Sequence, residues 1–222
     1  MPDAIEHVDT LQDHWWWRPG WRAGRHFYAC HFTMGQHPDL VQLVRRYQEA
    51  LRPFPGLDLI PMAWLHLTMQ GIGFVDELGG DQVSELELAI RQRLARVRTP
   101  VVTFRRPVVR PEAVFLPASP PEPVAEVRDA VRAVIADVLG PDNVELAPEH
   151  AQGYHPHVSL AYSNTTQAAG PIAEALSAVD VEPVTVTLDH VGLLEFHRDN
   201  RMYEWARAHQ IPVGGLATLP PR

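Results

Sequence analysis

Two five-residue stretches of this chain constrain its fold most strongly. Each places a histidine two residues before a hydroxyl side chain, with apolar residues between and around them: His66 and Thr68 in the first, His157 and Ser159 in the second. In an extended strand, alternate side chains share a face. Each stretch therefore predicts a strand that buries one face and presents an imidazole and a hydroxyl on the other. Two such faces lining one cleft would supply a general base and a general acid.

The composition favours an enzyme over a protein that coats nucleic acid. The chain has 222 residues, 45% of them hydrophobic, which is enough for a sizeable core in one large domain or two small lobes. Its formal net charge of −8 argues against binding long nucleic acid through the phosphates. The charge remains compatible with an enzyme that binds one phosphate at the end of a strand.

The sequence also favours a cytoplasmic protein. Cys30 is the sole cysteine, which excludes an intrachain disulfide and a cysteine-based zinc site. No apolar run approaches the length of a membrane span. The segment 1–14 is polar and acidic, unlike a signal peptide. We therefore expect a cytoplasmic location, no membrane partner and a monomer.

Apolar periodicity predicts an alternation of strands and helices. Strands are expected at 25–34, 57–61 (or a connecting segment), 64–71, 101–104, 108–116, 155–162, 184–194 and 202–211. Helices are expected at 39–51, 81–97, 124–139 and 172–178. Each half thus runs strand, helix, strand, helix. This order predicts an α+β fold that is bilobal, with two pseudo-symmetric lobes of antiparallel sheet, helices on the outside and a central cleft.

The two halves are expected to form one domain at 25–222, preceded by a tryptophan-rich arm at 1–24. A proline-rich stretch at 117–123 is expected to connect the lobes, and 184–194 and 202–211 are expected to pair as antiparallel strands.

The histidine pattern is weak by itself, because a third copy occurs at His31 and Thr33 in another expected strand. The neighbouring residues separate the three copies. Only the other two strands continue their histidine face with several polar or aromatic side chains, as a cleft lining would. We therefore choose His66 and His157 as the catalytic pair. The alternatives are that His31 replaces one of them, or that all are histidines without chemistry.

The residues around these two motifs resemble the two-histidine (2H) phosphoesterases, which include the bacterial 2′–5′ RNA ligase-like proteins and cyclic phosphodiesterases. The stretches Trp64–Gly73 and Tyr154–Tyr162 resemble the two family motifs, and 91 residues separate the two histidines, within the family's spacing. The order of elements agrees over about 25–212, with the arm outside the resemblance. Ser159 stands where the family often has threonine, which preserves the hydroxyl.

The resemblance implies hydrolysis or transfer at a phosphodiester that uses a ribose 2′ oxygen, with no metal or other cofactor. The implied substrates are 2′,3′-cyclic phosphates and 2′–5′ linked nucleotides, as small molecules or RNA 3′ ends. One histidine would take a proton from water and the other would protonate the leaving ribose oxygen, in an order that the sequence leaves open. Thr68 and Ser159 would hold the phosphate oxygens. The alternatives are 2′–5′ RNA ligation and an RNA-end binding module without significant catalysis.

Three further side chains are weaker candidates for substrate contacts. His155 lies two residues before His157, and Gln70 is expected on the face of His66, so both could reach the same cleft. Tyr154 could stack on a base, although packing is the alternative. His150, His155 and His157 could instead form a three-histidine zinc site, but no Asp or Glu at ligand spacing supports it.

The run Trp15–Trp17 is unusual. These residues could stack nucleobases at the edge of the cleft, form a partner surface, or fold back and cover a lobe.

Overall fold

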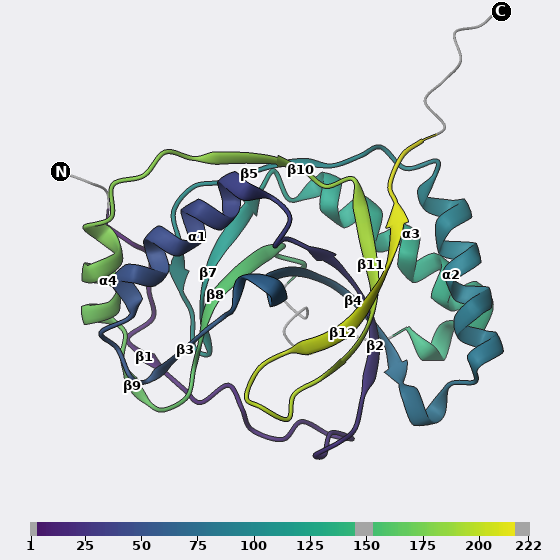
Figure 1. The fold of residues 1–222 in the computed structure, drawn as a ribbon, viewed down its shortest axis with the longest axis horizontal. Coiled ribbons are helices and arrows are strands. Elements are labelled where there is room, and N and C mark those ends of the chain that lie inside the picture. Colours follow the sequence, from purple (N-terminus) through teal and green to yellow (C-terminus); the bar gives the residue numbers. More distant parts are fainter. Residues whose placement is uncertain (1–3, 145–152, 216–222) are drawn as a thin grey trace, which may run out of the picture.

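The computed structural model describes residues 4–144 and 153–215, which form a curled antiparallel sheet with helices on its outer sides (Figure 1). The sheet order is β10-β5-β7-β8-β4-β2-β11-β12, with β3 and β6 attached to β8 and β7. Its described strands are β2 (Phe27–Thr33), β3 (Leu57–Leu59), β4 (His66–Phe74), β5 (Val101–Phe104), β6 (Val108–Val109), β7 (Ala113–Ser119), β8 (His157–Ser163), β10 (Val184–Thr187), β11 (His190–His197) and β12 (Glu204–Pro212). A separate small sheet pairs β1 (Thr10–Leu11) with β9 (Gln167–Ala168).

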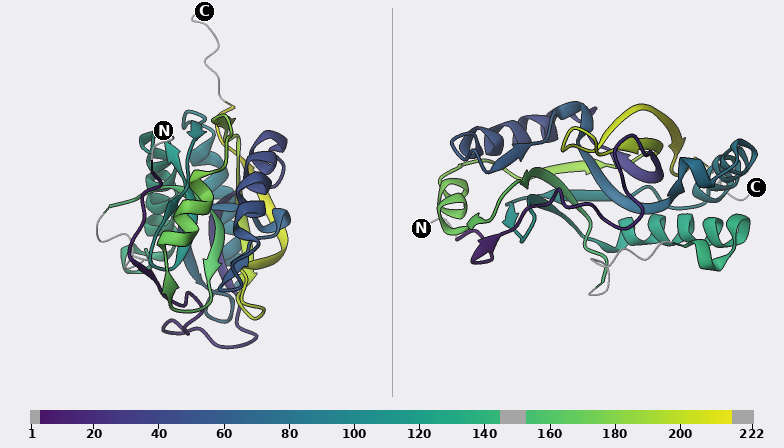
Figure 2. Two further views of the ribbon diagram at one scale, coloured as in Figure 1. Left: turned by 90° about the vertical axis from the view of Figure 1, so that its left-hand side faces the viewer. Right: turned by 90° about the horizontal axis from the view of Figure 1, so that it is seen from below.

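Two pairs of helices cover the two halves of this sheet, as the views of Figure 2 also show. The helices are α1 (Pro38–Leu51), α2 (Gly80–Leu94), α3 (Glu122–Leu139) and α4 (Gly170–Ser177), with short 3-10 turns at η1 (Met62–Trp64), η2 (Val75–Glu77) and η3 (Pro141–Asn143). α1 packs on α4 and on β3, β8 and β10, whereas α2 packs on α3, which lies against β4. The predicted bilobal α+β fold with pseudo-symmetric halves is confirmed.

The local sequence explains why the helices form where they do. α1 begins with Pro38, whose ring fixes a helical φ and whose missing N–H is not needed there. Its apolar stripe of Leu40, Leu43 and Val44 is buried, and each such side chain contributes about 1.5–3 kcal/mol on burial. α3 ends at Gly140, whose φ of 96° is a conformation that favours glycine.

The order of strands differs from the prediction in two places. The segment 184–194 contains two strands: β10 pairs with β5 in one half of the sheet, and β11 pairs with β2 and β12 in the other. Only β11 therefore forms the expected antiparallel pair with β12. The proline-rich connector is also shorter than expected, because β7 extends to Ser119 with Pro117 paired to His157. Alternation within a strand does not reveal which neighbour the strand will join.

Candidate active site

The two motif strands lie side by side at the centre of the sheet. β4 and β8 are antiparallel neighbours, with Leu67 paired to Val158, and both of these side chains are fully buried in the core. Continuing this register by one residue in each direction brings His66 beside Ser159 and Thr68 beside His157. Each histidine thus neighbours the hydroxyl of the other motif, and the two imidazoles share one face of the sheet.

Both imidazoles are anchored in the same way. Nδ1 of His66 donates a hydrogen bond to the carbonyl of Trp64 at 2.8 Å, and Nδ1 of His157 donates to the carbonyl of His155 at 2.8 Å. A histidine that donates through Nδ1 carries its other nitrogen, Nε2, as an acceptor when neutral. The backbone therefore fixes the tautomer and orientation of both rings, which is what proton transfer at Nε2 requires.

A β-bulge follows the hydroxyl of the first motif. On β4, Thr68 is paired with His31 and Gln70 with Cys30, so that Met69 is an extra residue in the strand. The bulge turns Gln70 to the side of Cys30, away from His66. The buried Gln70 amide accepts a hydrogen bond from the guanidinium of Arg132 on α3 at 2.8 Å. Gln70 therefore does not share the face of His66 as the alternation predicted, and its contact with substrate stays a prediction.

The second motif has the same bulge in the equivalent place. On β8, Ser159 is paired with Phe115 and Ala161 with Val114, which makes Leu160 the extra residue. The equivalence extends to the partner strands, because Phe115 now occupies the position that His31 has in the other half.

Each of these two partner residues stacks its ring on the motif histidine of the neighbouring strand. The ring of Phe115 stacks on His157 with centroids 4.0 Å apart, and the ring of His31 stacks on His66 with centroids 5.1 Å apart. Burial and the nearby charge of His66 lower the pKa of His31 to about 3. His31 is therefore a buried neutral ring, and the third copy of the sequence pattern is explained by packing against His66.

The two motif histidines differ in their surroundings. His66 is only 7% exposed, and His157 is half-buried. Burial lowers the pKa of His66 to about 4; the Trp64 carbonyl opposes this shift, and the charges of His157 and His14 add to it. His66 is thus neutral near pH 7.

The hydroxyl of Ser159 is buried and hydrogen-bonds to the side chain of Tyr162. Thr68 is half-buried, and its carbonyl accepts a hydrogen bond from the Tyr154 hydroxyl at 2.8 Å. Tyr154 also packs against the guanidinium of Arg128, 4.5 Å from its ring centroid. This arrangement favours the packing alternative for Tyr154 over base stacking.

The structure does not bring the histidines of the zinc alternative together at a metal site within the described residues. The side chain of His155 is exposed at the edge of β8, where its carbonyl anchors His157. His150, the third member of the zinc alternative, lies outside the described residues. Within the described ranges, no group of three or more His, Cys, Asp or Glu side chains is placed to hold a metal ion.

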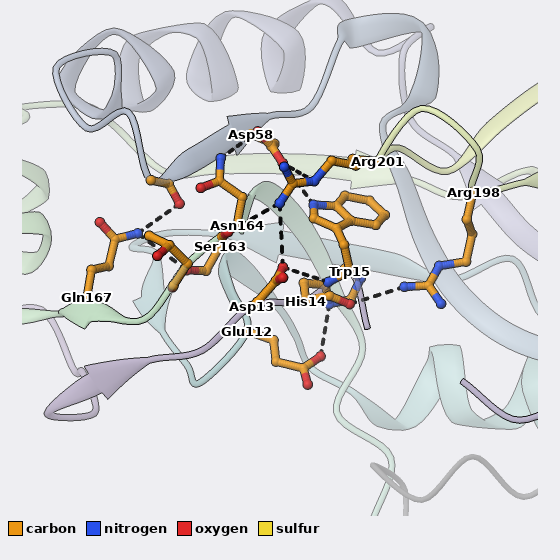
Figure 3. Close-up of polar contacts among 12 residues, drawn as sticks. Asp13, His14, Trp15, Asp58, Glu112, Ser163, Asn164, Gln167, Arg198 and Arg201 are labelled. Carbon is orange, nitrogen blue, oxygen red and sulfur yellow. Dashed lines mark hydrogen bonds and ion pairs between the residues drawn. The ribbon is translucent and has the colours of Figure 1, made fainter. Parts of the chain in front are cut away.

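The N-terminal arm brings polar residues to the site that sequence reasoning missed. His14 is 6% exposed and stacks on Tyr162 with ring centroids 4.2 Å apart. Its Nδ1 contacts Glu112 at 2.9 Å and its Nε2 contacts the Tyr203 hydroxyl at 3.0 Å. Figure 3 shows His14 between Glu112 and Arg198, which donates to the His14 carbonyl. No motif or periodicity marks His14, whose partners are 98 and 189 residues away.

The tryptophan run takes two different environments. Trp15 packs against Tyr162 and Tyr203, and its indole N–H donates to Asp58 at 2.8 Å. Trp16 and Trp17 are 50% and 55% exposed. The arm therefore does fold back on the sheet through Trp15.

An antiparallel sheet with two equivalent His-x-hydroxyl strands at its centre is the architecture of the two-histidine phosphoesterases. The sequence model of the 2'-5' RNA ligase superfamily matches residues 37–200, and the chain belongs to this superfamily. No curated protein matches the sequence. His14 and Tyr203 lie outside the matched segment.

Solved structures share the fold at low sequence identity. TT0787 of Thermus thermophilus is 22% identical with a TM-score of 0.59, over 84% of this chain and 97% of that one. A protein described as a phosphoesterase is 16% identical with a TM-score of 0.53, over 86% and 99%. E. coli LigT complexed with NADP+ is 15% identical with a TM-score of 0.50, over 85% and 95%. In the part of this chain that the structure describes, no helix is long and apolar enough to cross a membrane.

Proposed function

We propose that the protein is a phosphodiesterase that hydrolyses 2′,3′-cyclic phosphates or 2′–5′ linked nucleotides through its two motif histidines, without a metal ion. The observation that carries the proposal is the matched anchoring of His66 and His157 through Nδ1, which makes Nε2 the atom for proton transfer in both rings. E. coli LigT, which has this fold, has been crystallised with 3'-AMP. A small nucleotide or an RNA 3′ end is therefore the substrate class that we propose, for an enzyme that acts as a monomer in the cytoplasm.

The reaction needs one proton accepted and one proton donated. One imidazole takes a proton from water as the water oxygen bonds to phosphorus, and the other imidazole protonates the ribose oxygen as its bond to phosphorus breaks. Thr68 and Ser159 donate hydrogen bonds to the non-bridging oxygens, where negative charge develops. Because each hydroxyl neighbours the histidine of the other strand, the phosphate would be held between both motifs.

Hydrolysis of a panel of 2′,3′-cyclic nucleotides and 2′–5′ dinucleotides, with and without EDTA, tests this function. We expect turnover that survives EDTA and a bell-shaped pH dependence of kcat/KM. His66→Ala and His157→Ala should each abolish most of it. His209→Ala is the matched control, because His209 is an exposed histidine that pairs with Glu87 on α2.

In ligation an RNA 5′-hydroxyl takes the place of water as the nucleophile in the same site, and adding such an RNA to the same panel detects it. Nucleotide binding without turnover would contradict the enzyme proposal and support a binding module. Loss of turnover in EDTA would contradict the metal-free mechanism.

A further inference from the structure

A chain of three hydrogen-bonded side chains reaches the site, and two of its members, His14 and Tyr203, lie outside the matched segment. Glu112, which precedes β7, contacts Nδ1 of His14 at 2.9 Å, and Nε2 of His14 contacts the hydroxyl of Tyr203 at 3.0 Å. His14 is buried, and the carbonyl beside it is held by the buried Arg198. A buried histidine that is bonded at both nitrogens has a fixed ring and a fixed direction of hydrogen bonding.

The carboxylate of Glu112 sets that direction. Its Oε1 accepts a hydrogen bond from the Trp16 indole at 3.1 Å, and its Oε2 faces both His14 and, at 3.4 Å, Arg18. Burial opposes ionisation of Glu112, but the hydrogen bonds from His14 and Trp16 outweigh it and hold the pKa of this carboxyl below its ordinary value. An ionised carboxylate only accepts hydrogen bonds, so Nδ1 of His14 carries the proton.

His14 remains neutral in this setting. Burial is the main cause that lowers the pKa of His14, and the charges of Arg18 and Arg198 add to it, while Glu112 opposes it. Nε2 of neutral His14 must therefore accept the O–H of Tyr203. The phenol oxygen of Tyr203 is left as a hydrogen-bond acceptor with no proton to offer.

The ring of Tyr203 lies beside that of His66. Its ring centroid is 5.9 Å from that of His66 and 5.5 Å from that of Tyr162, whose hydroxyl bonds to Ser159. Nε2 of His66 is also an acceptor, because Nδ1 is committed to the Trp64 carbonyl. Two acceptors on neighbouring rings match a molecule with two donors, and water is such a molecule.

We propose that His66 and Tyr203 together hold the attacking water, which makes His66 the general base and His157 the general acid. His14 and Glu112 are positioning residues that keep the Tyr203 oxygen an acceptor. One water proton moves to Nε2 of His66 as the water oxygen bonds to phosphorus. The other stays hydrogen-bonded to Tyr203, and His157 protonates the leaving ribose oxygen. This assignment deepens the proposed function and rests on it.

The different environments of the two histidines support this assignment. A general base must be neutral before the reaction, and the buried His66 is neutral near pH 7. The half-buried His157 is better placed to exchange protons with solvent between turnovers.

Glu112→Gln tests the direction of hydrogen bonding with almost no change in shape. The Trp16 N–H, at 3.1 Å, favours the amide oxygen at the Oε1 position, and Arg18 approaches the Oε2 position only to 3.4 Å. With this orientation the amide nitrogen faces His14 and donates to Nδ1. The proton of His14 then moves to Nε2, and Tyr203 becomes a donor toward the site. We expect kcat on the best panel substrate to fall at least about 10-fold, as when the tautomer of a catalytic histidine is inverted. Tyr203→Phe should lower kcat by a similar factor, with KM little changed.

The double variant distinguishes a functional chain from two structural losses. Because both changes remove the same acceptor, Tyr203→Phe with Glu112→Gln should be no slower than Tyr203→Phe alone. Trp16→Phe is the control, since it removes a hydrogen bond to Glu112 outside the chain. Melting temperatures show that each variant is folded.

A folded Tyr203→Phe protein with wild-type kcat would overturn the inference, as would losses that multiply in the double variant. If His66→Ala is inactive while Tyr203→Phe is fully active, the two-histidine function stands and the water-holding role is refuted. If the wild-type protein turns over no substrate of the panel, both the two-histidine function and the water-holding role are refuted.

Discussion

The strands β4 and β8 repeat one another closely, and the contrast between them lies in what covers each histidine. In both strands Nδ1 of the histidine is tied to the carbonyl two residues earlier, the hydroxyl follows two residues later, and a bulge comes directly after it. In both, a ring on the neighbouring strand stacks on the imidazole. The backbone therefore forms the same arrangement of histidine, hydroxyl and bulge in both strands.

The two halves differ in the side chains that surround the motif histidines. Around His66 lie a second histidine, His31, and two aromatic residues of the β11–β12 region, Tyr203 and Trp205, whose ring centroids are 5.9 and 5.6 Å away. His157 is half-buried against Phe115. Two equal backbones can thus hold imidazoles in unequal surroundings, which is what a reaction with one base and one acid needs.

The largest expected effect tests whether the two histidines differ in role. On a ribose leaving group, His66→Ala and His157→Ala should each lower kcat/KM by about 10²–10⁴-fold. On an aryl phosphodiester such as bis(4-nitrophenyl) phosphate, the leaving group needs no proton. His157→Ala should then recover much of the wild-type rate, while His66→Ala should not. Recovery by His66→Ala instead would reverse the assignment.

The hydroxyls should show a smaller difference between the halves. Thr68→Ala and Ser159→Ala each remove a donor to the phosphate, and loss of one such donor lowers kcat by about 10²-fold. Ser159→Ala should lower kcat more than Thr68→Ala does, because it also leaves the Tyr162 hydroxyl without its Ser159 partner. Thr68→Ser keeps the donor and serves as the matched control. Equal rates for Thr68→Ala and wild type would refute the phosphate-holding role of that hydroxyl.

His31→Phe places a phenylalanine beside His66, as Phe115 lies beside His157 in the other half. Burial holds the pKa of His31 near 3 in the folded protein, whereas an unfolded histidine titrates near 6.5. The unfolded state therefore binds more protons than the folded state between these values, and stability is lost as the pH falls below about 6.5. At pH 5 this single group costs about 2 kcal/mol relative to pH 7.

Urea unfolding at pH 7 and pH 5 measures this cost. His31→Phe should lose less stability than the wild type on acidification, with His209→Ala as the control for an exposed histidine. An identical loss in His31→Phe and wild type would show that His31 is not kept neutral by burial.

The sequence predicted what depends on local alternation. Leu67 and Val158 are apolar between polar neighbours, so the strands and the side that His66 and His157 share could be inferred from period-2 spacing. The family resemblance then supplied the pairing of the motifs. Alternation continues past Thr68 without interruption, so nothing in the sequence indicates the bulge at Met69.

The neighbours of His66 could not be predicted for a different reason. His14 lies in an arm without periodicity, and it meets Glu112 and Tyr203 only because β6, β7 and β12 bring those residues to one place. A single histidine without a motif carries no signal for partners so distant in the chain. The hydrogen-bonded chain is thus a property of the tertiary structure alone.

The smallest expected effect compares two tyrosines that contact different motif residues, Tyr154 at Thr68 and Tyr203 at His66. Tyr154 donates to the Thr68 carbonyl at 2.8 Å and packs on Arg128, so its hydroxyl supports the strand. Tyr154→Phe should lower the free energy of unfolding by about 1 kcal/mol, because it leaves a carbonyl without its donor. Its kcat should equal that of the wild type.

Tyr203→Phe should lower the free energy of unfolding by a similar amount, because it leaves Nε2 of the buried His14 without its donor, but it should also show a clear fall in kcat. Urea unfolding and steady-state kinetics on the same two preparations separate the cases. A fall in kcat for Tyr154→Phe that matches Tyr203→Phe would mean that the site responds to loosening on either side. The different surroundings of His66 and His157 would then reflect packing rather than separate roles as base and acid.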